Sequence, residues 1–114
     1  MRPFRFDPED AGARLTAYAS SNTRFFTLAR SIGEAQLTCL RLGPGGCVGR
    51  HPAPVPQLFA VVAGDGRVKT PEGEEQISSG EAVFWEAGEE HETVAGEHGM
   101  TVFVLEAPSL TRAP

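Results

Sequence analysis

Cysteine is scarce in this sequence: Cys39 and Cys47 are the only two among 114 residues. Two thiols cannot form the several cross-links that stabilise small secreted domains, and in a reducing compartment they remain thiols. We therefore expect both to be small, buried side chains and not a covalent staple.

Long apolar runs are also missing, since no segment approaches the uninterrupted length needed to cross a bilayer. The stretch 1–8 contains two arginines but neither an apolar run nor a small-residue cleavage site, so it does not resemble a secretory signal. These absences predict a cytoplasmic protein without a membrane partner.

The sequence also lacks a cluster of basic residues. Fifteen acidic and ten basic residues give a formal net charge of -5, and the basic residues are scattered singly. Such a charge distribution repels phosphate backbones. We therefore expect no nucleic-acid partner.

Glycine and proline are abundant, and the 13 glycines and nine prolines punctuate short runs rich in Val, Phe and Leu. This pattern is typical of many short strands joined by tight turns. The predicted strands cover 24–29, 35–42, 57–63, 66–70, 74–77, 82–85, 92–95 and 100–106. Glycine-bearing turns are predicted at 33–34, 43–46, 64–66, 71–73 and 96–99.

Asp7 before Pro8 suits the start of a short helix over 8–18, which the sequence allows but does not require. Many short antiparallel strands hide their edges best by closing into a barrel or packing as two sheets. The predicted fold is thus all-β, an antiparallel barrel or jelly-roll sandwich. One domain spans 1–114, with its core at about 24–107.

Two segments keep a fixed spacing between glycines and histidines. Gly45, His51, Ala53, Gln57 and Gly64 fall at the positions of the first signature motif of the cupin family. That motif has a second histidine where this chain has Ala53 and a glutamate where it has Gln57.

The second segment resembles the second cupin motif in the same way. Gly80, Glu86, Gly88, His91 and Ala95 fall in register, with Glu86 in place of the family's proline and Ala95 in place of its asparagine. The chain is therefore identified as similar to small single-domain cupins with degenerate motifs.

This resemblance implies a cupin barrel whose interior holds a divalent metal, a small molecule or both. Carried over by position, the ligand set is His51, Gln57 and His91. Imidazoles suit zinc, iron, manganese, nickel or copper, whereas an amide oxygen brings no negative charge, so we expect a weaker site than one with a carboxylate. The resemblance also implies a homodimer.

Strand periodicity tests part of this assignment without the family. Even offsets place His51, Ala53, Gln57 and Phe59 on one face of an extended segment. Alternatives remain: the histidines could be ordinary half-buried residues, and Gln57 a buried amide bonded to backbone. Cys47 has the same parity as His51, so it is either an additional ligand or an inert buried thiol.

Two classes of function remain open, besides a purely structural dimer with an empty site. The residues at 53 and 57 favour a non-catalytic binding or sensing module. The alternative is a metal-dependent enzyme of the dioxygenase or isomerase type that acts on a small organic substrate, as the family resemblance implies. Fold alone does not select between them.

Overall fold

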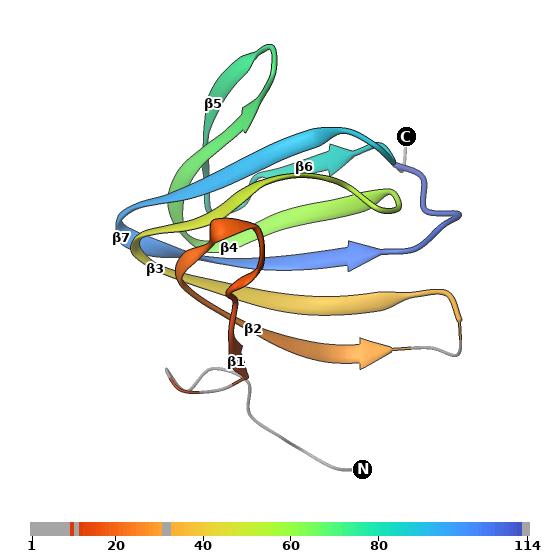
Figure 1. Ribbon diagram of the computed structural model, residues 1–114, viewed down its shortest axis with the longest axis horizontal. Coiled ribbons are helices and arrows are strands. Elements are labelled where there is room, and N and C mark those ends of the chain that lie inside the picture. Colours follow the sequence, from red (N-terminus) through yellow and green to blue (C-terminus); the bar gives the residue numbers. More distant parts are fainter. Residues whose placement is uncertain (1–9, 11, 31–32, 113–114) are drawn as a thin grey trace.

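The computed structural model describes residues 10, 12–30 and 33–112. Its elements are β1 (Ala13–Arg14), a 3-10 turn η1 (Ala17–Ala19), β2 (Ser21–Arg30), β3 (Gln36–Pro52), β4 (Gln57–Thr70), β5 (Gly73–Ser78), β6 (Ala82–Trp85) and β7 (Glu90–Glu106) (Figure 1). The all-β prediction is confirmed. Over these residues, no helix has the length and apolar character that a membrane span requires.

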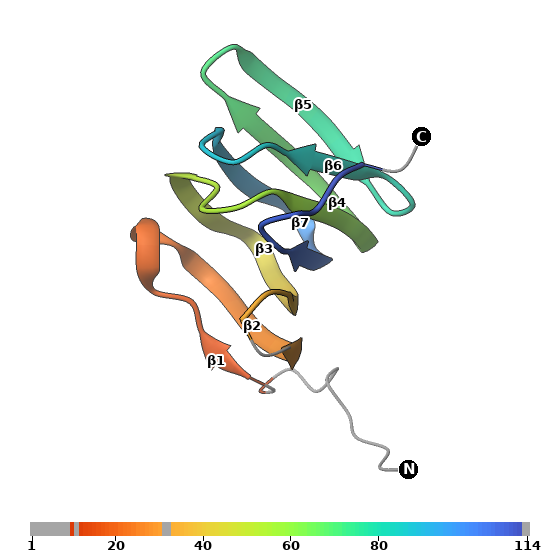
Figure 2. The same cartoon turned by 90° about the vertical axis from the view of Figure 1, so that its right-hand side faces the viewer.

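Three long strands, β3, β4 and β7, bend and contribute to both layers of the sandwich (Figures 1 and 2). All pairings are antiparallel, and β7 lies between β3 and β4. In one layer 36–42 and 57–63 flank 100–106, and β2 and β6 extend this layer. In the other layer the remaining halves of β3 and β4 flank the first half of β7, and β5 extends it.

The bends occupy three segments that the sequence predicts as turns between strands: 43–46, 64–66 and 96–99. The strands instead continue through them with shifts of register. Gly64 and Gly99 both have positive φ, and a Cβ on Gly64 would collide with the carbonyl oxygen of Gly99. Glycine therefore lets two backbones approach closely at the corner without ending either strand.

The helix expected over 8–18 does not form in the part that can be described. Ala13 and Arg14 pair with β2, and 17–19 form a single 3-10 turn in which Tyr18 has a φ of 60°. Pairing with β2 satisfies the backbone groups that a helix would have satisfied locally. Asp7 and Pro8, the expected helix start, lie outside the described residues.

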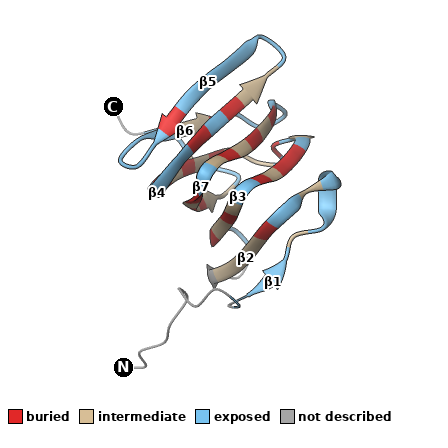
Figure 3. Cartoon of the chain, turned by 90° about the vertical axis from the view of Figure 1, so that its left-hand side faces the viewer, coloured by how far each residue is buried: buried red, intermediate tan, exposed pale blue. Residues whose placement is uncertain are grey.

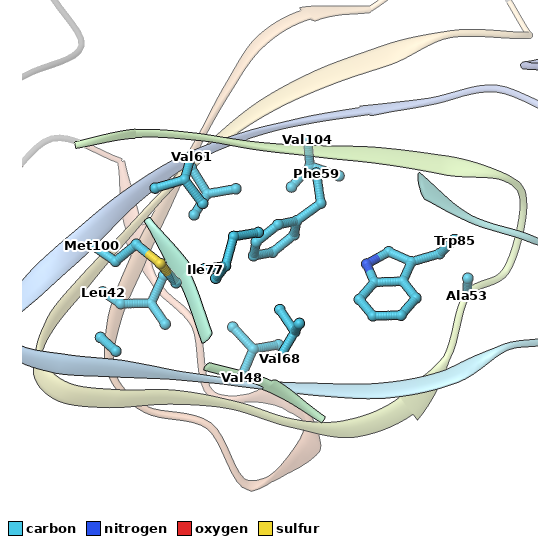
Figure 4. Close-up of a cluster of buried hydrophobic side chains, with 12 residues drawn as sticks. Leu42, Val48, Ala53, Phe59, Val61, Val68, Ile77, Trp85, Met100 and Val104 are labelled. Atoms are coloured by element: carbon cyan, nitrogen blue, oxygen red, sulfur yellow. The ribbon is translucent and has the colours of Figure 1, made fainter. Parts of the chain in front are cut away.

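Buried positions recur along the long strands (Figure 3). Their side chains form one apolar core together with Ile77 of β5 and Trp85 of β6 (Figure 4). At the bends it is closed, because Leu42 and Val102 are only 2% and 0% exposed and pack with Val61 and Met100. At the opposite end, β3 finishes and β7 begins, and polar residues appear on the inner face. This open end carries the candidate site.

Candidate functional site

His51 and His91 come together at the open end of the sandwich. They are directly opposite each other on β3 and β7, and their ring centroids lie 4.6 Å apart at an interplanar angle of 58°. His91 is only 5% exposed, while His51 is half-buried and lines a cavity. Two imidazoles are thus held at one position of the interior by a single cross-strand pair.

Both imidazoles are oriented by their own strand in the same way. The Nδ1 atom of His51 lies 2.7 Å from the carbonyl oxygen of Gly49, and Nδ1 of His91 lies 3.1 Å from that of Glu89. A carbonyl oxygen only accepts, so Nδ1 carries the proton in each ring and the Nε2 lone pair is left available. This is the tautomer that a metal ligand needs.

Burial lowers the pKa of His91 below its ordinary value of 6.5, and the neighbouring His51 acts in the same direction. The hydrogen bond to the Glu89 carbonyl and the Glu89 carboxylate oppose this shift but are outweighed. The imidazole of His91 is therefore neutral at pH 7, as metal ligation requires.

Aromatic rings cover both histidines. Tyr18 stacks on His51 with centroids 4.0 Å apart at 7°, and Trp85 stacks on His91 at 4.6 Å and 8°. The backbone oxygen of Tyr18 sits where a Cβ on residue 49 would be, so Gly49 lets η1 pack directly on β3. The stacking contacts restrict how either imidazole can rotate.

A second polar row faces this pair from the other layer. Gln36, Glu106, Gln57 and Trp85 are successive cross-strand partners on β3, β7, β4 and β6. Gln57 Nε2 donates to Glu106 Oε2 at 2.8 Å, and Gln36 Nε2 donates to Glu106 Oε1 at 3.2 Å. Gln57 is thus a buried amide whose side chain bonds to a carboxylate. The alternative drawn from the sequence, a buried amide bonded to backbone, has the wrong partner.

A cavity of about 250 Å³ opens beside these residues. Its polar lining includes His51, Gln57 and Glu106, and its apolar lining comes from Leu15, Phe25, Leu40, Val48, Pro54 and Val104. Pro54, which follows the end of β3, forms part of this wall. The cavity can hold a small molecule with a largely apolar body.

Cys47 lies on the opposite face from this cavity. The pairing of β3 with β7 shifts register between Val48 and His51, so Val48 faces inward and Cys47 outward. The thiol lies 3.9 Å from Glu92 Oε2, and burial, together with that carboxylate, raises its pKa. The bulge, which the parity of the sequence did not reveal, leaves Cys47 half-buried on the outer face, so the expectation that both cysteines are buried is confirmed only for Cys39.

The donors present fit a modest site for a divalent cation. Within the described part of the chain, no three His, Cys, Asp or Glu side chains gather as a ligand group. The Nε2 atoms of His51 and His91 and the amide oxygen of Gln57 nevertheless come from three adjacent strands at one end of the interior. Such nitrogen-rich sets suit zinc, nickel, copper or iron more than calcium or magnesium.

Scans of the sequence against protein-family models and against curated proteins found no match. Comparison of the structure did find similar folds. A cupin-like protein from Thermotoga maritima matches with a TM-score of 0.77 and 15% identity, over 86% of this chain and 78% of that one. This chain folds as a small cupin domain.

Two further structures resemble this cupin domain. The polyketide cyclase RemF from Streptomyces resistomycificus has a TM-score of 0.81 and 21% identity, over 100% of this chain and 82% of its own. KdgF from Halomonas sp. has a TM-score of 0.70 and 21% identity, over 78% and 81%. At these identities the likeness concerns the fold.

Sequence reasoning missed three residues of the candidate site, and only one had a readable signal. Glu106 follows Val102 and Val104 at even spacing, so a carboxylate on the inner face could have been anticipated. Trp85 lies in the apolar core, and nothing in the sequence indicates its stack on His91. Tyr18 depends on a left-handed turn for which the sequence gives no cue.

Proposed function

We propose that this cupin domain binds a divalent transition-metal ion through Nε2 of His51, Nε2 of His91 and the amide oxygen of Gln57, and a small molecule in the adjoining cavity. The observation that carries the proposal is the matched pair of Nδ1 to carbonyl hydrogen bonds. Histidine ligands in metalloproteins commonly donate their second ring nitrogen in this manner, which fixes tautomer and orientation.

The cavity supports the small-molecule part of the proposal. A cavity of about 150 Å³ lined by apolar side chains admits benzene, so the volume of about 250 Å³ here accommodates a molecule of one or two rings.

Turnover of the bound molecule is the second candidate. The similarity to the polyketide cyclase extends over 100% of this chain, and therefore includes the segment that brings Tyr18 over His51. A metal bound at the histidines would supply a Lewis acid for polarising a carbonyl oxygen. A metal-dependent enzyme acting on a polyketide or a comparable polycarbonyl compound is the corresponding alternative to a binding module.

Elemental analysis of the purified protein and thermal unfolding with added Zn²⁺, Ni²⁺ or Mn²⁺ test the proposal. We expect near-stoichiometric metal or metal-dependent stabilisation, of about 2.7 kcal/mol when free metal is 100 times Kd, and loss of both in His51→Ala and His91→Ala. His98→Ala is the matched control, because the His98 side chain is 80% exposed. Metal-free wild type without stabilisation would refute the metal site.

The same preparations distinguish the two classes of function. Cyclisation of a linear polyketide by wild type, but not by His91→Ala, would favour the enzyme. Metal binding without turnover would favour the binding module.

A further inference from the structure

We propose that Glu106 is a positioning residue that supplies, through Gln57, the negative charge missing from the site and turns the Gln57 amide oxygen toward the metal. The inference rests on the metal-binding function proposed above. It starts from the cross-strand pair of Gln57 on β4 and Glu106 on β7, which share one inner face and one cavity.

The orientation of the Gln57 amide follows from the chemistry of its partner. A carboxylate accepts hydrogen bonds and donates none, so the amide atom 2.8 Å from Glu106 Oε2 must be the nitrogen. The amide oxygen is then directed away from Glu106. Without the carboxylate, the two ends of the amide would be nearly equivalent, and the nitrogen could occupy the ligand position.

Glu106 itself is fixed by a second contact. Gln36 Nε2 donates to the other carboxylate oxygen, Oε1, and also contacts Thr38 Oγ1 at 3.3 Å. The carboxylate is therefore held between two amides and is not free to swing toward the histidines. It is the only charged side chain among the described residues that line this cavity.

Direct ligation by Glu106 is disfavoured by the same geometry. Where the structure is described, no cluster of three His, Cys, Asp or Glu includes it with His51 and His91. An amide that donates a hydrogen bond to a carboxylate is polarised by it. Its oxygen then carries more negative charge and binds a cation more strongly. The carboxylate thus acts on the metal through Gln57.

Replacing Glu106 with glutamine removes the charge and preserves the size of the side chain. Removing comparable outer partners of ligands weakens metal binding by about 10- to 100-fold. We expect E106Q to weaken Ni²⁺ and Co²⁺ binding to a similar extent, measured by calorimetric titration, and to change the visible absorption of the Co²⁺ form. Glu92→Gln is the matched control, because Glu92 is also an acid of β7 but contacts Cys47 on the outer face.

An exchange of the two residues provides the rescue. In the double variant Q57E/E106Q the hydrogen bond survives with its direction reversed, and the charge moves to the ligand position. We expect its metal affinity to return at least to the wild-type value. The single variant Q57E places two carboxylates face to face, so it should be less stable than the double variant.

These results separate the inference from the function on which it rests. Wild-type affinity in E106Q, or failure of the folded double variant to recover affinity, overturns the role of Glu106 even when His51→Ala abolishes binding. Absence of metal binding in the wild type overturns both proposals. If E106Q does not fold, Glu106→Asp, which keeps the charge but shortens its reach, must weaken binding for the inference to stand.

Discussion

The closed and open ends of the sandwich interior are built from the same three bent strands but carry opposite chemistry. At the closed end Leu42 and Met100 pair across β3 and β7 within an apolar core. At the open end of the same pair of strands, His51 faces His91. The bent middle of each strand therefore packs the core, while the ends of the strands carry the candidate site.

The largest expected effect comes from damaging the closed end. Leu42→Ala removes a side chain that is 2% exposed and leaves a cavity, which should lower the free energy of unfolding by about 2–5 kcal/mol. Urea unfolding followed by circular dichroism measures this loss. Metal affinity of the folded variant should stay at the wild-type value, because the substitution lies at the end away from His51.

One outcome of the Leu42→Ala experiment would contradict this prediction. If Leu42→Ala remained folded but lost metal binding, the two ends would be coupled, and the division between stability and binding would be wrong. Met100→Leu, a volume-conserving change in the same cluster, should cost less than about 1.5 kcal/mol and serves as the control for specific packing.

An intermediate effect is expected from acid at the open end. Burial lowers the pKa of His91 in the folded protein, so the unfolded chain takes up a proton more readily. The associated stability is fully present above pH 6.5, the ordinary value, and decreases as the pH falls below it toward the lower pKa of the folded state. Urea midpoints of chelator-treated protein between pH 8 and pH 5 measure this dependence.

His91→Gln should flatten this part of the pH profile, whereas His98→Ala should retain it, since His98 lies in solvent. Equal slopes in wild type and His91→Gln would show that the buried imidazole is not the group that destabilises the folded protein in acid.

Sequence reasoning was most successful where one local rule decides the outcome. The strand class and the inner face of β4 follow from alternation, and Gln57 and Phe59 are buried there as expected. The glycines at 64 and 99 were correctly read as special, but as turns and not as corners inside strands. A glycine alone does not tell whether pairing resumes beyond it.

The site was predictable only as far as position along a strand determines it. His51 and His91 are placed together as the motif spacing implies, while the metal assignment stays a prediction. The partner of Gln57 could not be foreseen, because the register between β4 and β7 sets it over a long sequence separation. Cys47 faces outward and not inward, because the bulge between Val48 and His51 reverses which face the preceding residues of β3 occupy.

The smallest expected effect sharpens the comparison at the turn that covers the open end. Ala19 and Tyr18 have φ values of 56° and 60°, in a region that costs a residue other than glycine roughly 1–2 kcal/mol. Ala19→Gly relieves this cost but increases the entropy of the unfolded chain by about 0.4–1 kcal/mol. A net gain of up to about 1.6 kcal/mol in the free energy of unfolding is expected.

Ala87→Gly is the matched control, because Ala87 is also exposed but does not have positive φ. It should be neutral or slightly destabilising in the same urea titration, and neither variant should change metal affinity. Equal destabilisation by both substitutions would mean that the left-handed turn is not adopted in solution. A gain confined to Ala19→Gly would mean that the open end keeps a strained turn to hold Tyr18 on His51, whereas the closed end places its bends at glycines.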